Sequence, residues 1–294
     1  MERIKLKSYG KINLSLDVLG RRENGYHDLV MIMQSVGLYD EVIIERTKES
    51  GITIICDTKG VPQDGRNIAY KAADLLIKEF QLDTGICITL NKKIPAAAGM
   101  AGGSSNAAAV IKGMNELFEL QLTLDDMKAF GVKLGADVPY CLQGGTCLAE
   151  GIGEILTVLP NMPDCFIAIS NPPYEVSTAE VFNAIDNKKE YKHPDTESII
   201  EGIKEQDISK IARNMGNVLE SVTSVMHPDI NRIKEIMNMC GAHGSMMTGS
   251  GPTVFGIFND ESSSYKAIEN IEREKLATRN FVVRGRITGG YYGN

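Results

Sequence analysis

Hydrophobic and polar residues alternate most regularly near the start of the chain, in the segment KINLSLDV at residues 11–18. Successive side chains of a strand point to opposite faces, so this alternation predicts one apolar face and one polar face. The apolar face carries Ile12, Leu14, Leu16 and Val18. The polar face carries Lys11, Asn13, Ser15 and Asp17. Lys11 and Asn13, two residues apart, are therefore expected to lie side by side.

Strand-like and helix-like patterns alternate over the rest of the first 160 residues. The segments EVIIE and GITIIC, residues 41–45 and 51–56, predict two strands that form a hairpin. GICITLNKKIP, residues 85–95, predicts a strand that runs into a glycine-rich stretch. Helices are predicted from about Asn67 to Phe80, directly after the glycine-rich stretch, and within residues 122–139.

Two of these helices carry further signals. The helix after the glycine-rich stretch has an apolar stripe, which indicates that it packs on one side. The stripe is Ala107, Ile111, Met114 and Phe118. In the later helix, Thr123 is the expected N-cap with Asp126 three residues on, and Gly135 is the expected stop. Asp137 is expected in a loop just past the helix end, and Pro139 favours an extended conformation for Val138, the residue before it.

A domain boundary is predicted near residue 160, where four prolines bracket the strand-like segment CFIAIS. The expected domains are residues 1–160 and residues 161–294. The second half is helix-rich between Ser177 and Met239 and returns to strands at GSMMTGSGPTVFGIF and FVVRGRITGGYYGN. The predicted fold class is therefore α+β in two domains, with the cleft between them as the expected site.

Composition narrows the classes of function. The net charge of -7 gives no electrostatic reason to expect nucleic acid or a membrane surface as a partner. The start, MERIKLKSYGKINL, has no signal-peptide core, and no apolar run approaches the ~18 residues of a membrane helix, so a cytoplasmic protein is expected. The six cysteines form no CxxC and no metal-ligand spacing with the four histidines, so buried thiols are expected and structural zinc is not.

The stretch IPAAAGMAGGSSNAAAV, residues 94–110, carries the clearest chemical signal. Gly99, Gly102 and Gly103 let the backbone lie against a ligand, because no side chain intervenes. Ser104 and Ser105 are expected to begin a helix whose unpaired amides form an anion site suited to phosphate. The stretch lacks the lysine of a Walker loop and fits no dinucleotide fingerprint. A glycine-rich connection with no ligand stays open on these residues alone.

Two later segments add to this signal. TGSGPTVFGIF, residues 248–258, is a second Gly/Ser turn that leads into a strand, and GADVPYCLQGG contains Asp137. In this order, the early strand, the loop from Pro95 to Ser105 and the later turn resemble the GHMP kinases. Their loop pattern is P-x-x-x-G-[LM]-x-[GS]-[GS]-S-[SA], from whose commonest form Met100 and Ala101 depart slightly.

Within this superfamily, the chain resembles the kinases that phosphorylate a cytidine diphosphate-linked methylerythritol in the non-mevalonate isoprenoid pathway. The segments that carry this resemblance are RRENGYHDLVMIMQSV, GADVPYCLQGGTCLAEGIGE and MTGSGPTVFGIF, and it extends from Lys11 to beyond Phe258. It implies a two-domain α+β GHMP kinase fold with a first domain like ribosomal protein S5 domain 2. It also implies phosphorylation of the 2-hydroxyl by ATP with Mg²⁺, whose ligands stay unknown beyond Ser104 or Ser105 as candidates.

The resemblance implies roles for individual residues. Lys11 and Asp137 match the catalytic pair, in which Asp137 accepts the proton of the attacking hydroxyl and Lys11 orients that carboxylate and offsets negative charge on the transferred group. The residues that match the ATP contacts are Asn67, Pro95, Ala96, Ala97, Ala98, Gly99, Met100, Ala101, Gly102, Gly103, Ser104 and Ser105. The residues that match the substrate contacts are Asn13, Tyr26, His27, Thr178, Phe182, Gly249, Ser250 and Gly251. Tyr26, His27 and Phe182 are implied to hold the cytosine, since an aromatic face stacks on a base.

Ordinary alternatives stay open for several of these residues. Lys11 suits a solvated strand face, Asp137 a solvated loop, and Asn67 a helix N-cap. A GHMP kinase for mevalonate, homoserine or a sugar is the first rival function. A noncatalytic RNA-binding module is the second, although the acidic balance and the absence of a basic stripe disfavour it. Monomer and weak homodimer are both compatible with the sequence.

Overall fold

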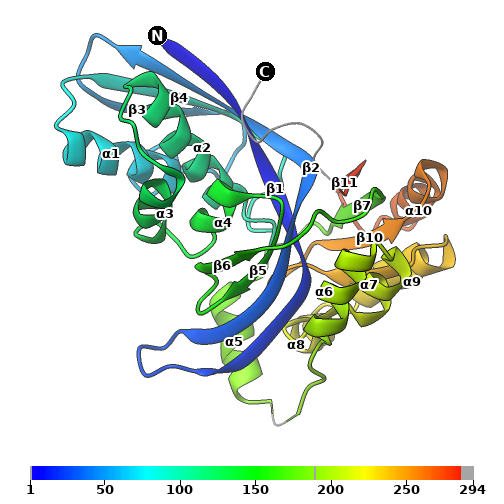
Figure 1. The fold of residues 1–294 in the computed structure, drawn as a ribbon. Helices are drawn as coiled ribbons and strands as arrows, with labels where there is room; N and C mark the ends of the chain where they lie inside the picture. The colour runs from blue at the N-terminus through cyan, green and yellow to red at the C-terminus, as the bar shows by residue number, and fades with distance from the viewer. Residues whose placement is uncertain (1, 189, 286–294) are drawn as a thin grey trace.

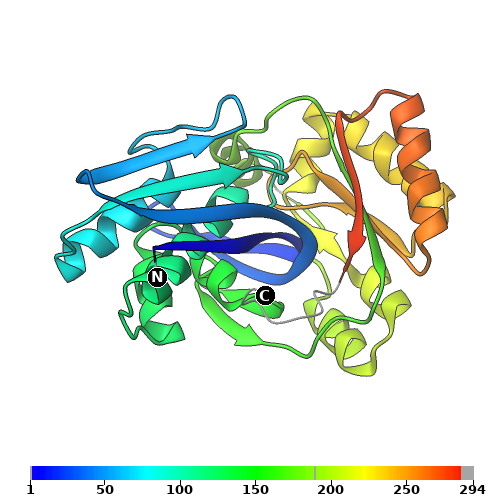
Figure 2. The same ribbon diagram turned by 90° about the horizontal axis from the view of Figure 1, so that it is seen from above.

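The computed structural model describes residues 2–188 and 190–285 of the 294-residue chain. Within these residues, a seven-stranded sheet and a four-stranded sheet lie side by side, each with its own helices (Figures 1 and 2). The first sheet is built mainly from the first half of the chain. The second sheet is built from the second half, so the chain forms two α+β halves.

The first sheet is organised around one long antiparallel hairpin, β1 (Arg3–Arg21) and β2 (His27–Thr47). Its other strands are β3 (Gly51–Cys56), β4 (Gly85–Asn91), β5 (Thr146–Glu150), β6 (Ile155–Val158) and β8 (Gly216–Asn217). The strand order is β3-β4-β2-β1-β8, with β5 paired to β2 and β6 paired to β5. The short β8 comes from the second half and pairs in parallel with β1, so it joins the two halves.

The predicted strand over residues 11–18 is confirmed as part of β1. Its apolar face is buried as expected, with Ile12 and Leu14 fully inaccessible to solvent. Its polar face is also buried, because Lys11 is only 5% exposed and Asn13 is 0% exposed. The glycine-rich loop and the turn at Thr248 cover this face. The solvated strand face that was an alternative for Lys11 is therefore wrong.

The predicted hairpin of residues 41–45 with residues 51–56 is wrong, although both segments are strands. β4 lies between β2 and β3, antiparallel to β2 and parallel to β3. With a partner on each side, β4 is an inner strand of the sheet, and its alternate side chains Ile86, Ile88 and Leu90 are buried on one face. The turn after β2 crosses over the start of β4, where a Cβ on Gly85 would lie 1.7 Å from the Glu49 carbonyl oxygen. Glycine makes this crossing possible.

Four helices accompany the first sheet (Figure 1). They are α1 (Ile68–Phe80), α2 (Gly102–Leu117), α3 (Leu124–Val132) and α4 (Val138–Gln143). Helix α2 packs on the sheet, and the predicted stripe residues Ala107, Ile111 and Met114 are fully buried. Helix α1 lies beside α2 and covers β3.

The helix predicted within residues 122–139 is α3, and a second helix, α4, follows it that the sequence did not predict. Thr123 and Asp126 form the predicted capping box at the start of α3. Helix α3 ends at Val132, before Gly135, and the chain turns before α4 begins. The extended conformation expected before Pro139 is also wrong, because the proline lies in the first turn of α4, where no N–H is needed. Asp137 lies between the helices, as predicted.

The second half contains an antiparallel sheet of order β11-β7-β10-β9. Its strands are β7 (Phe166–Asn171), β9 (Gly244–Met247), β10 (Val254–Phe258) and β11 (Arg279–Arg284). The predicted strands are confirmed where they are described, while residues 286–294 of the last one lie outside the described residues. The helices are α5 (Thr178–Asp186), α6 (Thr196–Glu205), α7 (Ile208–Asn214), α8 (Glu220–Met226), α9 (Asp229–Met239) and α10 (Glu261–Arg273). The predicted helix-rich region is therefore confirmed.

An apolar cluster joins the two sheets. It contains Ile12 and Ile32 from the first sheet and Ile167, Ile169 and Phe255 from the second, all fully buried. Such a shared core holds the two halves in one relative position. The division at residue 160 remains a prediction, which the change of sheet between β6 and β7 supports.

Candidate active site

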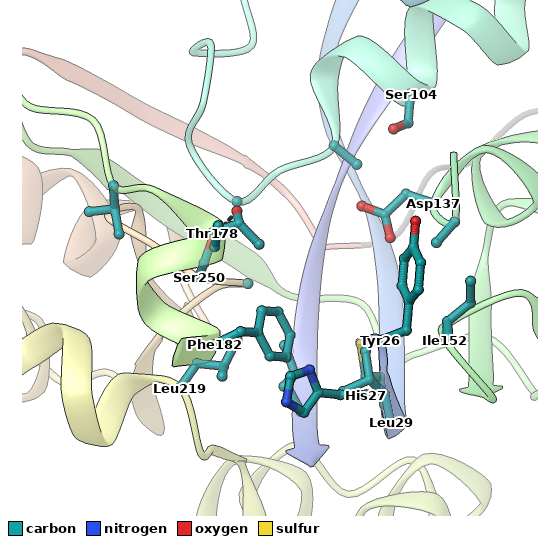
Figure 3. Close-up of a pocket in the computed structure, with 18 of the residues that line it drawn as sticks. Tyr26, His27, Leu29, Ser104, Asp137, Ile152, Thr178, Phe182, Leu219 and Ser250 are labelled. Carbon is teal, nitrogen blue, oxygen red and sulfur yellow. Dashed lines mark hydrogen bonds between the residues drawn. The ribbon is translucent and has the colours of Figure 1, made fainter. Parts of the chain in front are cut away.

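A cavity of about 570 Å³ opens between the two halves (Figure 3). Its volume is typical of sites for small molecules, which span roughly 300–1,000 Å³. Twelve of the residues predicted from the sequence line it. They are Lys11, Tyr26, His27, Ala97, Gly99, Ala101, Ser104, Asp137, Thr178, Phe182, Gly249 and Ser250. The fold therefore brings together segments that lie far apart in the chain.

The other predicted residues do not line this cavity. They are Asn13, Asn67, Pro95, Ala96, Ala98, Met100, Gly102, Gly103, Ser105 and Gly251. Asn67 is the N-cap of α1, because its side chain accepts a hydrogen bond from the Ala69 amide at 2.9 Å. This contact is the structural alternative that its sequence position left open. Met100 is buried in the core between the sheets.

Lys11 lines the cavity, and Asn13 holds its side chain from behind. The Lys11 ammonium donates to Asn13 Oδ1 at 2.7 Å and to the Gly99 carbonyl at 2.9 Å. Asn13 Oδ1 also accepts from the backbone N–H of Gly249 at 3.1 Å. The backbone N–H of Asn13 donates to Thr248 Oγ1 at 3.0 Å. Asn13 therefore connects β1 to the β9–β10 turn and fixes the direction of the lysine.

Asp137 is on another wall of the cavity, at the N-cap position of α4. Figure 3 shows its carboxylate near the Tyr26 hydroxyl, on the side of the cavity away from Thr178 and Ser250. In the described part of the chain, no ion pair within 4.0 Å joins Asp137 to Lys11. The implied orientation of Asp137 by Lys11 is thus not a direct contact in this structure.

Cys141 lies behind this wall and is buried. Burial raises the pKa of its thiol, and the charge of Asp137 raises it further. A thiol in this environment stays protonated and is a poor nucleophile. Cys141 is therefore not expected to act as a nucleophile, and the reactive groups of the cavity are oxygen and nitrogen atoms.

The glycine-rich loop has a backbone that few residues adopt. Gly99 has a φ of 72°, and the alanines Ala97 and Ala101 have φ values of 49° and 55°. Left-handed conformations in residues other than glycine cost about 1–2 kcal/mol each and often occur at functional sites. A Cβ on Gly99 would lie 2.2 Å from the Thr248 carbonyl oxygen, so only glycine fits there.

Helix α2 begins at Gly102, two residues earlier than the serine start that the sequence predicted. Its N-cap residue Ala101 makes no side-chain capping bond. The first amides of the helix are consequently left for a ligand at the positive end of the helix dipole. Ser104 faces the cavity, whereas Ser105 Oγ donates to the Tyr9 carbonyl at 2.6 Å and turns toward β1.

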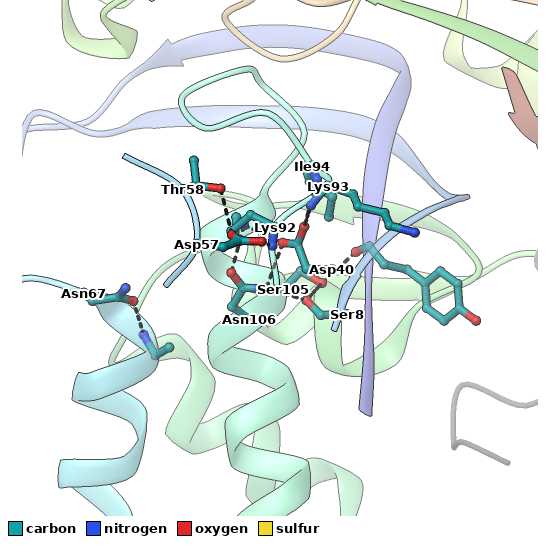
Figure 4. A network of polar contacts seen from close by, with 12 residues as sticks. Ser8, Asp40, Asp57, Thr58, Asn67, Lys92, Lys93, Ile94, Ser105 and Asn106 are labelled. Carbon is teal, nitrogen blue, oxygen red and sulfur yellow. Dashed lines mark hydrogen bonds and ion pairs between the residues drawn. The ribbon is translucent and has the colours of Figure 1, made fainter. Parts of the chain in front are cut away.

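A buried polar network holds the segments that flank the loop (Figure 4). Asp40, which is 0% exposed, accepts from the amides of Lys93 and Ile94 at 2.6 and 2.8 Å. It also accepts from Asn106 Nδ2 at 2.9 Å and pairs with the Lys92 ammonium. Sequence reasoning missed this network, although Asp40 was a signal, because it shares a strand face with the apolar residues Leu38 and Val42.

The opposite end of the cavity is built from the tip of the β1–β2 hairpin and from α5. The His27 and Phe182 rings stack with centroids 4.7 Å apart and planes 25° apart. His27 Nε2 lies 2.7 Å from Asp186 Oδ1, and Arg21 Nη1 lies 3.3 Å from Asp186 Oδ2. Arg21 lines the cavity, and neither it nor Asp186 was predicted. The spacing of Phe182 and Asp186, four residues apart on a helix, was the available signal.

The cavity offers few side chains that could bind a metal ion, which suits an ion held mostly by a phosphate compound and water. Among the described residues, no group of three or more histidine, cysteine or acidic side chains lies together. Of the described residues that line the cavity, Asp137 alone carries a carboxylate, and Ser104 adds a hydroxyl. Mg²⁺ commonly takes one or two protein oxygens and completes its shell with phosphate and water. Ser104 and Asp137 therefore fit a Mg²⁺ ion that arrives with a phosphate compound.

Two family matches cover much of the chain. The GHMP kinases N terminal domain matches residues 67–145, and the GHMP kinases C terminal domain matches residues 199–278. Among solved structures, a crystal structure of 4-(cytidine 5'-diphospho)-2C-methyl-D-erythritol kinase is similar with a TM-score of 0.81 at 29% identity. That match covers 96% of this chain and 98% of the other. A homoserine kinase from Cytophaga hutchinsonii, 20% identical with a TM-score of 0.78 over 97% and 96% of the chains, shares the fold.

Sequence relatives are closer. A protein of Lachnospira eligens called 4-diphosphocytidyl-2-C-methyl-D-erythritol kinase is 55% identical over 279 residues, which is 95% of this chain and 96% of that protein. A protein of Acetivibrio thermocellus with the same name is 48% identical over 95% of this chain and 99% of that protein. These findings confirm the predicted two-domain GHMP kinase fold and contradict the RNA-binding alternative. No helix in the described part of the chain is long and apolar enough to cross a membrane. The chain belongs to the GHMP kinases and, within them, to the 4-diphosphocytidyl-2-C-methyl-D-erythritol kinase family.

Proposed function

We propose that this chain transfers the γ-phosphoryl group of ATP to the 2-hydroxyl of 4-diphosphocytidyl-2-C-methyl-D-erythritol. The products are the 2-phosphate and ADP, and the reaction serves the non-mevalonate synthesis of isoprenoid precursors in the cytoplasm. The observation that carries the proposal is the 55% identity to a relative of that name over 95% of the chain. We expect the protein to act as a monomer or a weak homodimer.

The glycine-rich end of the cavity is the proposed ATP site. The uncapped start of α2 and the Ser104 hydroxyl provide donors for the triphosphate, and Lys11 provides a positive charge beside Gly99. Phosphoryl transfer depends mostly on such positioning and electrostatics, because its transition state is loose. Mg²⁺, when bound, neutralises phosphate charge, and Ser104 and Asp137 are the residues that would hold it.

Asp137 and Lys11 are the proposed catalytic residues. As the bond between the substrate oxygen and the γ-phosphorus forms and the bond to the ADP oxygen breaks, the hydroxyl proton passes to Asp137. Lys11 is held by Asn13 and Gly99 rather than by Asp137. We therefore assign it the role of stabilising the negative charge on the transferred phosphoryl group. A positioned base typically contributes ~10²–10⁴-fold in rate.

The other end is the proposed cytidine site. His27 and Phe182 form one aromatic wall, and Tyr26 stands 58% exposed at the opening. Base stacking on aromatic side chains is worth about 1–3 kcal/mol per base. Thr178 and Ser250, whose hydroxyls lie 2.8 Å apart, line the region between the two ends and are suited to the polyol and diphosphate.

The test is ATP consumption with and without the cytidine substrate, with the phosphorylated position identified by phosphorus NMR. Mevalonate, homoserine and a panel of sugars serve as competing acceptors. Consumption that depends on one of these and not on the cytidine substrate would show that the proposed function is wrong. Asp137→Asn should lower kcat by ~10²–10⁴-fold while ATP still binds. Undiminished turnover in this variant would remove Asp137 from the role of base.

A further inference from the structure

One face of helix α5 holds the His27 imidazole in two ways. Phe182 and Asp186 are four residues apart, so they lie one above the other on the same face of the helix. Phe182 stacks on the imidazole. The Asp186 Oδ1 atom lies 2.7 Å from Nε2, at the edge of the same ring. His27 is 8% exposed and lines the cavity, so its ring is held between the helix and the ligand space (Figure 3).

The Asp186 carboxylate is itself anchored. Its second oxygen lies 3.3 Å from Arg21 Nη1, and Arg21 is the strand partner of His27 across the β1–β2 hairpin. The Asp186 side chain is 21% exposed, so water reaches it only in part. Two neighbouring positions of one hairpin therefore hold both oxygens of one carboxylate, which keeps the carboxylate from rotating.

This arrangement determines which nitrogen of His27 carries hydrogen. An ionised carboxylate only accepts hydrogen bonds, so the hydrogen is on Nε2, the nitrogen next to Asp186. In the neutral ring, Nδ1 then has a free lone pair and accepts hydrogen bonds. Cytosine has an amino donor at the position where uracil has a carbonyl acceptor. An imidazole that is held as an acceptor therefore favours cytosine and disfavours uracil.

We propose that Asp186 is a positioning residue that acts through His27 to make this end of the cavity select cytosine over uracil. This inference rests on the proposed function, because it takes the base end of the cavity to be the cytidine site. Asp186 touches no reacting atom. Its contribution is the tautomer and the orientation of the imidazole, and Arg21 secures the carboxylate.

The experiment measures binding of cytidine diphosphate and uridine diphosphate by calorimetry, with a saturating nonhydrolysable ATP analogue present. We expect the wild-type protein to bind the cytidine compound with an affinity about tenfold or more above that for the uridine compound, because one buried hydrogen bond contributes a difference of this size. Asp186→Ala should remove most of this preference, and Asp186→Asn, which keeps an acceptor oxygen for Nε2, should retain part of it. Glu180→Ala, an exposed residue of the same helix, is the matched control and should retain all of it.

A double-mutant cycle tests whether Asp186 acts through His27. In the His27→Ala background, Asp186→Ala should change neither the affinity for cytidine diphosphate nor the preference. Additive losses, equal losses for the two nucleotides, or an Asp186→Ala variant that discriminates like the wild type would each overturn the inference. In turnover assays, Asp186→Ala should raise the KM for the cytidine substrate. The KM for ATP and kcat should stay within about twofold, because Asp186 affects only the recognition of the cytosine base.

These outcomes separate the two proposals. A wild-type protein that binds both nucleotides equally overturns the role of Asp186, whatever its turnover. A wild-type protein that selects the cytidine compound and yet fails to phosphorylate the cytidine-linked substrate leaves the role of Asp186 supported and the proposed reaction wrong.

Discussion

The two ends of the cavity are held by different kinds of contact. Behind the glycine-rich loop, Asp40 is fully buried and the Lys92 side chain is 4% exposed. At the base end, Arg21 is 58% exposed and its partner Asp186 is 21% exposed. Buried, mutually bonded groups keep one geometry, because water does not compete for their hydrogen bonds. Exposed ion pairs are weakened by water and salt.

This difference fits what each end is proposed to bind. A triphosphate needs several amides and one ammonium at set positions, which a rigid support provides. A base needs one stacking surface and a few hydrogen bonds, and a helix that docks on a hairpin tip can provide these. We therefore expect changes behind the loop to lower stability, and changes at the base end to alter selectivity with little loss of stability.

The largest effect is expected from Asp40→Ala. This change leaves the Lys92 ammonium buried without its carboxylate and removes the acceptor of the Lys93 and Ile94 amides. Breaking a buried ion pair typically lowers the free energy of unfolding by about 3–5 kcal/mol. Urea denaturation measures the loss. The control is Asp74→Ala, which breaks the exposed Asp74–Lys78 pair of α1 and should cause no measurable loss. Equal stability of the two variants would contradict the comparison.

The next effect compares one glycine from each end. Gly99→Ala would push a Cβ to 2.2 Å from the Thr248 carbonyl at a φ of 72°, so it should cost about 2–4 kcal/mol in stability and weaken ATP binding. Gly25→Ala, at a φ of 86° on the hairpin tip, meets no atom within 4 Å and should cost only about 1–2 kcal/mol. Thermal unfolding and ATP titration check both. Equal losses would show that crowding at Gly99 is relieved by movement of the loop.

A third prediction concerns pH and the buried lysine of α2. Burial lowers the pKa of Lys112 from 10.5 to about 8. Between pH 8 and pH 10.5 the unfolded chain therefore binds more protons at this residue, and stability rises with pH by up to about 1.4 kcal/mol per pH unit. Lys112→Met should remove this rise in unfolding experiments over that range. Parallel stability curves for the two proteins would show that Lys112 keeps an ordinary pKa.

The smallest effect is expected at the hairpin tip. Arg22 donates two hydrogen bonds to Asp28 and holds the pKa of that carboxyl below its usual value. Both side chains are partly exposed, so solvent screens the pair and Asp28→Asn should shift the unfolding midpoint by no more than the error of the measurement. The KM for the cytidine substrate should also be unchanged. A clear loss of stability would mean that the base end is as rigidly supported as the loop end.

Sequence reasoning succeeded where a signal is local. The capping box of Thr123 and Asp126 and the apolar stripe of α2 depend on residues three or four apart, and both are present. The glycine-rich loop was also recognisable, because Gly99 occupies a backbone conformation that other residues avoid. The start of α2 was misplaced by two residues, since the glycines that permit the loop also complete the first helical turn.

The candidate site was predicted in its outline and missed in its supports. Lys11, Asp137, His27 and Phe182 line one cavity, as the family resemblance implied. Asp186 was missed because its partner His27 is 159 residues away, and the four-residue spacing from Phe182 puts the two side chains on one helix face without showing what that face meets.

The sequence by itself determined the periodic elements, the turn chemistry of the loop and the membership of the family, because these depend on residue types in order. Only the tertiary structure decided that β4 separates β2 from β3, that the polar face of β1 is buried, and that Asp40 supports the loop. The physical reason is that strand pairing and buried polar contacts depend on which distant segments meet. That choice is made by the packing of the whole chain, and no single segment records it.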